Sequence, residues 1–148
     1  MLLRRRIILP WLLSAVVMYA LSFLWHGVAL TDLQELRIPL PLYLALSGLV
    51  YLVLGLLITI GVHQSIMHEW ISLKRGFPLM SMLLGAAVGF VVYLLVFILG
   101  MSFASREVVH IVVDILWQML EQGLGGLMVS FGLMYDMHRT FMDAERAK

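Results

Sequence analysis

Four apolar stretches, at residues 7–28, 42–64, 78–102 and 108–135, constrain the fold of this chain more than any other feature. Each is about 20 residues long or more, and a helix of that length crosses a hydrocarbon core of about 30 Å. The sequence therefore predicts an all-α protein, a polytopic transmembrane four-helix bundle. We expect residues 1–148 to form this single transmembrane domain.

The composition supports a membrane protein. Hydrophobic residues make up 62% of the chain and charged residues 13%, whereas globular chains are about 45–50% apolar and about 25% charged. The lipid bilayer is thus the first expected partner. A formal net charge of +1 without a basic stripe predicts no nucleic-acid partner. The chain has no cysteine, which excludes disulfides and thiolate catalysis.

The distribution of Lys and Arg predicts the orientation. If four spans alternate, Arg37 and Arg106 lie on one side, and the other eight cationic residues lie on the side of the termini: Arg4, Arg5, Arg6, Lys74, Arg75, Arg139, Arg146 and Lys148. Cytoplasmic loops carry the excess of such residues. We therefore expect cytoplasmic N and C termini in a bacterial inner (cytoplasmic) membrane. The first apolar run exceeds the 7 to 15 residues of a signal-peptide core, so it is expected to be a retained helix.

Small residues recur in the third stretch at intervals of four, at Ser81, Gly85 and Gly89. This pattern allows two helix backbones to approach closely in a membrane. It predicts tight packing inside the bundle. The alternative is a face that makes a homodimer.

The fourth stretch differs from the others because polar residues recur along it every three or four positions: His110, Asp114, Gln118, Glu121 and Gln122. At about 100° per residue, these side chains fall within an arc of roughly 120°. A membrane helix with two acids and a histidine on one face has a wet or protein-lined side. This stripe is the candidate site of the protein.

Residues of the other helices are expected to meet the stripe at the outer end. The first helix runs the opposite way and places His26 at the depth of His110, with Tyr19 on the same face, while Tyr51 and Tyr93 come from the second and third helices. The predicted ligand or proton pathway comprises His26, His110, Asp114, Gln118, Glu121, Tyr19, Tyr51 and Trp117. At 1.5 Å per residue, Asp114 and Glu121 are about 10 Å apart along the axis, too far to share one proton or ion.

The two acids have two interpretations. An ionised carboxylate at the centre of a membrane helix costs about 2.5–3.5 kcal/mol, so such residues are functional candidates. A buried carboxyl avoids that cost by binding a proton, and this makes Asp114 and Glu121 possible proton carriers. Alternatively both are neutral and hydrogen-bonded to neighbouring Gln or Tyr side chains, linking helices.

The tryptophans are assigned by position. Trp11 and Trp25 lie at opposite ends of the first helix, as interfacial anchors do. Trp117 lies well inside the fourth stretch, where it serves core packing or offers a stacking surface to a flat apolar ligand such as haem or quinone.

A second polar group is expected at the cytoplasmic side, at His63, His68 and His138, together with Glu69 and Asp136. Imidazole binds zinc, copper, iron and nickel, so these histidines are metal candidates. Their spacing matches no metal motif. The alternative is a polar loop at the membrane interface.

The segments LSFLWHG, which closes the first helix, and HIVVDILWQ, in the last helix, resemble those of small uncharacterised bacterial four-helix membrane proteins. The resemblance covers the layout of most of the chain. It implies the four-helix arrangement and no activity, cofactor or catalytic residue.

The predicted function is the handling of a proton, an ion or a small polar ligand through the polar interior, as in a transporter or channel. Four helices enclose little space, so a homo-oligomer or a partner membrane subunit is expected to complete a path. Two alternatives remain: a non-catalytic accessory or assembly subunit of a membrane complex, and a haem- or quinone-binding membrane redox protein. We identify no catalytic residue and no required cofactor, and an enzyme is not expected.

Overall fold

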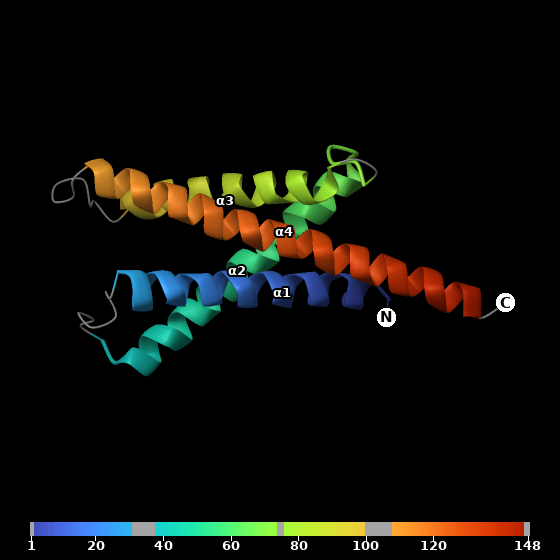
Figure 1. Ribbon diagram of the computed structural model, residues 1–148, viewed down its shortest axis with the longest axis horizontal. Helices are drawn as coiled ribbons and strands as arrows, with labels where there is room; N and C mark the ends of the chain where they lie inside the picture. The colour runs from blue at the N-terminus through green and yellow to red at the C-terminus, as the bar shows by residue number, and fades with distance from the viewer. Residues whose placement is uncertain (1, 31–37, 74–75, 100–107, 147–148) are drawn as a thin grey trace.

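The structure is a computed structural model that describes residues 2–30, 38–73, 76–99 and 108–146, almost all of them helical (Figure 1). The helices are α1 (Leu2–Leu24), the π-helical turn η1 (Trp25–Ala29), α2 (Leu40–Met67), α3 (Phe77–Leu99) and α4 (Val108–Arg146). The first apolar stretch lies in α1 and η1, and each of the others lies in one α-helix, apart from residues 100–102 of the third stretch, which are outside the described ranges. The all-α prediction is confirmed.

Several helices extend beyond the apolar stretches. α1 begins at Leu2 and α4 continues to Arg146, because charged residues such as Arg and Glu favour helix outside a membrane as well. α2 begins after Pro39, with a second proline in its first turn, where a missing N–H is tolerated. It ends where the His68 N–H donates to the Gln64 carbonyl oxygen at 2.9 Å and Glu69 adopts a left-handed φ of 60°.

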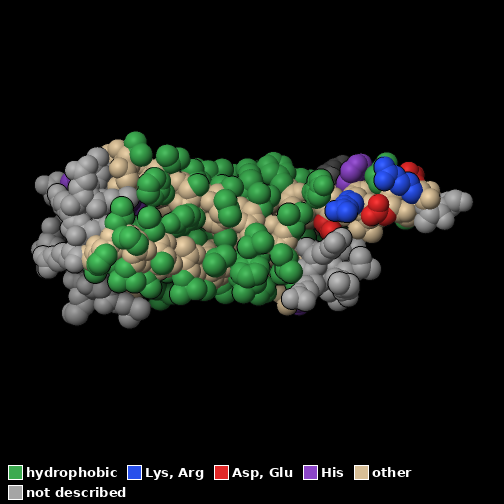
Figure 2. Space-filling model, turned by 90° about the horizontal axis from the view of Figure 1, so that it is seen from below, with side chains coloured by type: hydrophobic (Ala, Val, Ile, Leu, Met, Phe, Trp, Pro, Cys, Tyr) green, Lys and Arg blue, Asp and Glu red, His purple; other side chains and the backbone are tan. Residues whose placement is uncertain are grey.

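Among the described residues, three helical segments are long and apolar enough to cross a membrane: Ile7–Ala29, Leu40–Met67 and Phe77–Val96. Figure 2 agrees, because hydrophobic side chains cover the middle of the face it shows, and charged side chains gather at the end where α4 projects. The chain therefore has the features of a multi-pass membrane protein. α4 is long enough as well, but its polar stripe keeps it out of this apolar group.

α4 lies between α1 and α3 and runs antiparallel to both, while α2 crosses the other helices obliquely (Figure 1). The N and C termini lie at one end of the molecule, and η1, the start of α2, the end of α3 and the start of α4 lie at the other. The core draws residues from all four α-helices, and its fully buried members are Met18, Ile58, Val62 and Val129.

The small residues bring α3 and α4 into backbone contact. A Cβ atom added at Gly85 would overlap the carbonyl oxygen of Gln122, and one added at Gly126 would overlap that of Ser81. Ser81 and Gly85 are buried within the chain. The pattern therefore serves packing inside the bundle, as predicted, and is not available as a dimer face.

Candidate functional site

A cleft of about 960 Å³ lies at the end of the molecule opposite the termini, between the end of α1, α2, α3 and the start of α4. It forms because α2 departs from α3 and α4 there: the buried residues of α2 begin only at Tyr51. Six of the eight predicted site residues line this cleft: His26, Tyr51, His110, Asp114, Trp117 and Gln118. Tyr93 joins them, as the polar faces of the helices predict.

The π-helical turn brings a further aromatic residue into the cleft. The Leu30 N–H donates to the Trp25 carbonyl oxygen at 2.8 Å, five residues back, which widens the last turn of the helix. The ring of Trp25 stacks on that of Trp117, with centroids 4.2 Å apart and planes inclined by 12°. Sequence reasoning assigned Trp25 only as an interfacial anchor, because no residue pattern signals a π turn.

Glu121 lies one helical turn beyond Trp117 and is fully buried. The Tyr51 hydroxyl and the Trp117 indole N–H face its carboxyl group, but outside hydrogen-bonding geometry. Within the described part of the chain, neither carboxyl oxygen has a hydrogen-bond partner. The two donors thus come from α2 and from the preceding turn of α4, and both interpretations of Glu121, as a proton carrier and as a link between helices, stay predictions. Tyr51 and Trp117 line the cleft on one side and face Glu121 on the other, so they separate the two.

Gln122, the next residue, points to a different helix because successive residues differ by about 100°. A Cβ atom at Gly89 of α3 would lie 2.7 Å from Gln122 Cγ. Gln122 is fully buried, and its amide atoms have no hydrogen-bond partner in the described ranges. Glu121 and Gln122 are thus both enclosed by helices of this chain.

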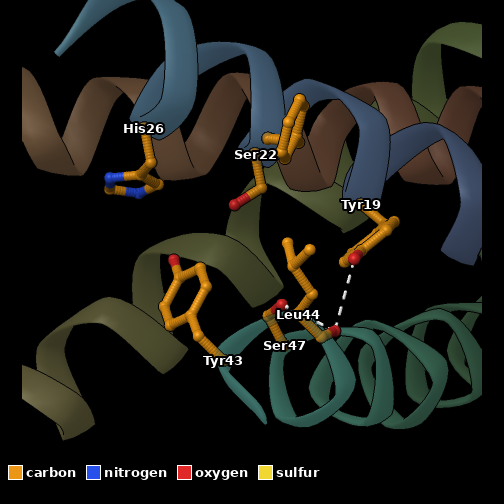
Figure 3. Close-up of a pocket in the computed structure, with 7 residues that line it drawn as sticks. Tyr19, Ser22, His26, Tyr43, Leu44 and Ser47 are labelled. Carbon is orange, nitrogen blue, oxygen red and sulfur yellow. Dashed lines mark hydrogen bonds between the residues drawn. The ribbon is translucent and has the colours of Figure 1, made fainter. Parts of the chain in front are cut away.

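The remaining predicted residue, Tyr19, lines a separate small pocket between α1 and α2 (Figure 3). Its hydroxyl donates to the Leu44 carbonyl oxygen at 3.3 Å, and its ring packs edge-on against Tyr51 at 6.1 Å. The pocket has a volume of about 10 Å³, the space that one water molecule needs. His26 lines both this pocket and the cleft. In Figure 3 the His26 ring and the Tyr43 hydroxyl lie at the end of the pocket away from Tyr19.

The metal candidates, which the sequence places on the predicted cytoplasmic side, are not brought together. Across the described ranges, no three His, Asp or Glu side chains are close enough to hold a metal ion. His63 is half-buried on α2 and His138 exposed on α4. His68 Nδ1 lies 2.9 Å from the Gln64 carbonyl oxygen, and the ring lies 5.6 Å from that of the exposed Trp70. His63 and His138 thus lie within helices and His68 directly after α2, and the alternative of a polar loop at the membrane interface stays a prediction.

The site thus consists of the cleft and the carboxyl group enclosed beneath it, with polar residues that become more buried along α4: His110 is exposed, Asp114 half-buried and Glu121 fully buried. No protein-family model, curated protein or solved structure matches the chain.

Proposed function

We propose that the protein handles a proton, an ion or a small polar ligand through the interior around α4. In this proposal α4 is a fourth membrane span and both termini lie in the bacterial cytoplasm. Three observations support a fourth span: α4 has 39 residues, packs along α1 and α3, and runs between their ends. The up-and-down arrangement also places the cation-rich ends of the chain at one end of the bundle.

The observation that carries the proposal is the state of Glu121. Its carboxyl group is fully buried, makes no hydrogen bond within the described part of the chain, and lies behind Tyr51 and Trp117, which line the cleft. An apolar side chain would pack there at lower cost, since a buried polar group without a partner costs about 1–3 kcal/mol. A protein that keeps a carboxyl group at such a position has a use for it, and reversible binding of a proton or cation is the use that a carboxyl offers.

Asp114 supplies a second acidic group nearer to the outer end. It lines the cleft, whereas Glu121 lies about 10 Å farther along the helix axis at 1.5 Å per residue. The two acids therefore act in sequence, with Asp114 at the cleft and Glu121 behind Tyr51 and Trp117.

Proton movement tests this directly. Purified protein is reconstituted into liposomes that contain a pH-sensitive dye, and a potassium diffusion potential drives proton entry. We expect the wild-type protein to acidify the lumen faster than empty liposomes do, and Glu121→Gln to remove most of that increase. Glu69→Gln is the matched control, because Glu69 is exposed in the turn after α2. Equal rates for Glu121→Gln and wild type would contradict the proposal.

A membrane redox protein is the second candidate, favoured by one observation: His26 and His110 line the same cleft, next to the stacked Trp25 and Trp117 rings. Two imidazoles are a common pair of axial ligands for haem iron. Protein purified from cells grown with a haem precursor would then show a Soret band that His26→Ala and His110→Ala both remove. A colourless wild-type sample rules out the haem form of this candidate.

A further inference from the structure

We propose that the cleft at the outer end of the bundle is a binding site for a lipophilic organic cation, held by aromatic rings and balanced by the Glu121 carboxylate. This inference rests on the proposed function and names the class of ligand. It is drawn from the charge, the walls and the rim of the cleft.

Among the described residues of the helices near the cleft, the Lys, Arg, Asp and Glu side chains are of one sign. From Ile7 to His138, the described residues include no Lys or Arg, and the acids within the helices near the cleft are Asp114 and Glu121. An ionised Glu121 therefore has no protein cation beside it in this part of the chain. In a medium of low dielectric constant an unpaired carboxylate is unfavourable, and an organic cation seated above it would supply the missing charge.

The walls favour an organic cation over a bare metal ion. Aromatic rings from four helical elements face the cleft: Trp25, Tyr51, Tyr93 and Trp117. The faces of such rings attract cations, most strongly those that have lost their water. A volume of about 960 Å³ is at the upper end of the range for small-molecule sites, about 300–1,000 Å³, and far exceeds what a single ion needs.

The rim indicates how such a ligand would enter. Exposed valines from α2, α3 and α4 surround the cleft, with exposed fractions of 53% for Val50, 64% for Val96 and 68% for Val109. An apolar rim on a membrane protein faces lipid, so a molecule already dissolved in the bilayer can reach the site from the side. The same charge pattern disfavours haem, because its two propionates would meet Asp114 without a described Lys or Arg to pair with.

Two ions of nearly equal shape and opposite charge provide the test. Binding of radiolabelled tetraphenylphosphonium and of tetraphenylborate to the full-length protein in detergent is measured by equilibrium dialysis. We expect saturable binding of the phosphonium cation and no saturable binding of the borate anion. Glu121→Gln should weaken cation binding by roughly tenfold, the effect of losing about 1.4 kcal/mol of charge interaction. Glu69→Gln, in the exposed turn, should bind as the wild type does.

Equal binding of the two ions, or unchanged cation binding in Glu121→Gln, overturns the inference. Because Glu121 is buried, each variant is first checked by size-exclusion chromatography, and Asp114→Asn, at the half-buried cleft surface, provides a second variant expected to weaken cation binding. The proton-entry assay separates the two proposals. Glu121-dependent proton entry without cation binding refutes this inference and leaves the proposed function standing, whereas loss of both refutes both.

Discussion

Among the described residues, three buried hydroxyl groups, those of Thr59, Ser65 and Ser130, bond to their own helix, whereas the carboxyl group of Glu121 does not. The Thr59 hydroxyl donates to the Gly55 carbonyl oxygen at 2.7 Å, and the Ser65 hydroxyl to that of Gly61 at 2.8 Å. Short hydroxyl side chains reach the backbone four residues back, so their burial in a membrane helix costs little. The longer side chain of Glu121 extends away from its own helix towards Tyr51. Its burial is therefore a cost that the fold bears.

Replacing Glu121 by residues of similar size should raise stability in a fixed order. Glu121→Gln removes the ionisable group but keeps two polar atoms without partners, and Glu121→Met removes the polar atoms too. We expect the melting temperature to be lowest for the wild type, higher for Glu121→Gln and highest for Glu121→Met. The free energy of unfolding should increase by up to about 1–3 kcal/mol. Intrinsic fluorescence in detergent measures this, since the chain has no cysteine for thiol dyes. A wild-type protein more stable than both variants would argue against the cost assigned to Glu121.

The Trp25–Trp117 stack provides a spectroscopic prediction. Two indoles 4.2 Å apart and nearly parallel couple their electronic transitions, which gives a paired positive and negative band in circular dichroism. We expect Trp25→Phe and Trp117→Phe each to abolish this band. Trp70→Phe should leave it unchanged, because Trp70 is 80% exposed in the turn after α2. If the band persisted in Trp25→Phe or in Trp117→Phe, the Trp25 and Trp117 rings would not be its source, and the stacked arrangement would be contradicted.

The sequence predicts most of the residues of the site, but it does not predict which of them line the cleft, which are enclosed in the bundle and which lie in a separate pocket. The polar period along α4 identifies Asp114, Gln118 and Glu121, because hydrocarbon penalises polar groups whichever helices pack nearby. That Glu121 faces α2 while Gln122 faces α3 depends on how the helices cross, which no single helix encodes. Tyr19 was assigned to the outer pocket on the same basis, and the crossing of α1 and α2 places it in a separate one.

At the scale of the helices, glycines allow the close backbone contacts between helices. The cleft forms where α2 makes no such contact with α3 and α4. α3 and α4 meet backbone to backbone through Gly85 and Gly126. α2 approaches α1 closely at Gly55, where a Cβ atom would lie 3.1 Å from that of Ala15. Towards its start α2 remains beside α1, as the Tyr19 contact with Leu44 indicates, but leaves α3 and α4. The spacing of small residues predicts the first contact, whereas the divergence of α2 has no sequence signal.

Replacing either of two glycines by alanine should therefore change the stability of the protein in opposite directions. Gly85→Ala forces a Cβ atom into the Gln122 carbonyl oxygen, so α3 and α4 must separate, at an expected cost of about 1–3 kcal/mol. Gly48→Ala meets its nearest atom, Tyr19 Cε2, at 3.9 Å, an ordinary contact. Its helix preference should stabilise the protein by up to about 0.5–1 kcal/mol. Thermal unfolding in detergent compares the two, and similar melting temperatures would contradict the close α3–α4 packing.

For the molecule as a whole, the up-and-down arrangement links the orientations of all the helices, so the orientation of one helix in the membrane fixes that of the others. Residues at the two ends of the bundle must lie on opposite sides of the membrane if α4 crosses it with the other three helices. The positive-inside rule then assigns the end with the termini to the cytoplasm, and the cleft to the opposite side. A ligand of the cleft would consequently arrive from outside the cytoplasm or from the outer part of the bilayer.

The absence of cysteine makes this orientation directly testable. Single cysteines are introduced at exposed positions near the two ends of α4, Val108→Cys and Glu145→Cys, and cells whose outer membrane has been made permeable are treated with a membrane-impermeant maleimide. We expect Val108→Cys to be labelled in these cells, and Glu145→Cys only after the inner membrane is opened. Labelling of both before that step would mean that α4 does not cross the membrane. The reverse pattern would place the cleft in the cytoplasm, where its ligand would have to be an intracellular one.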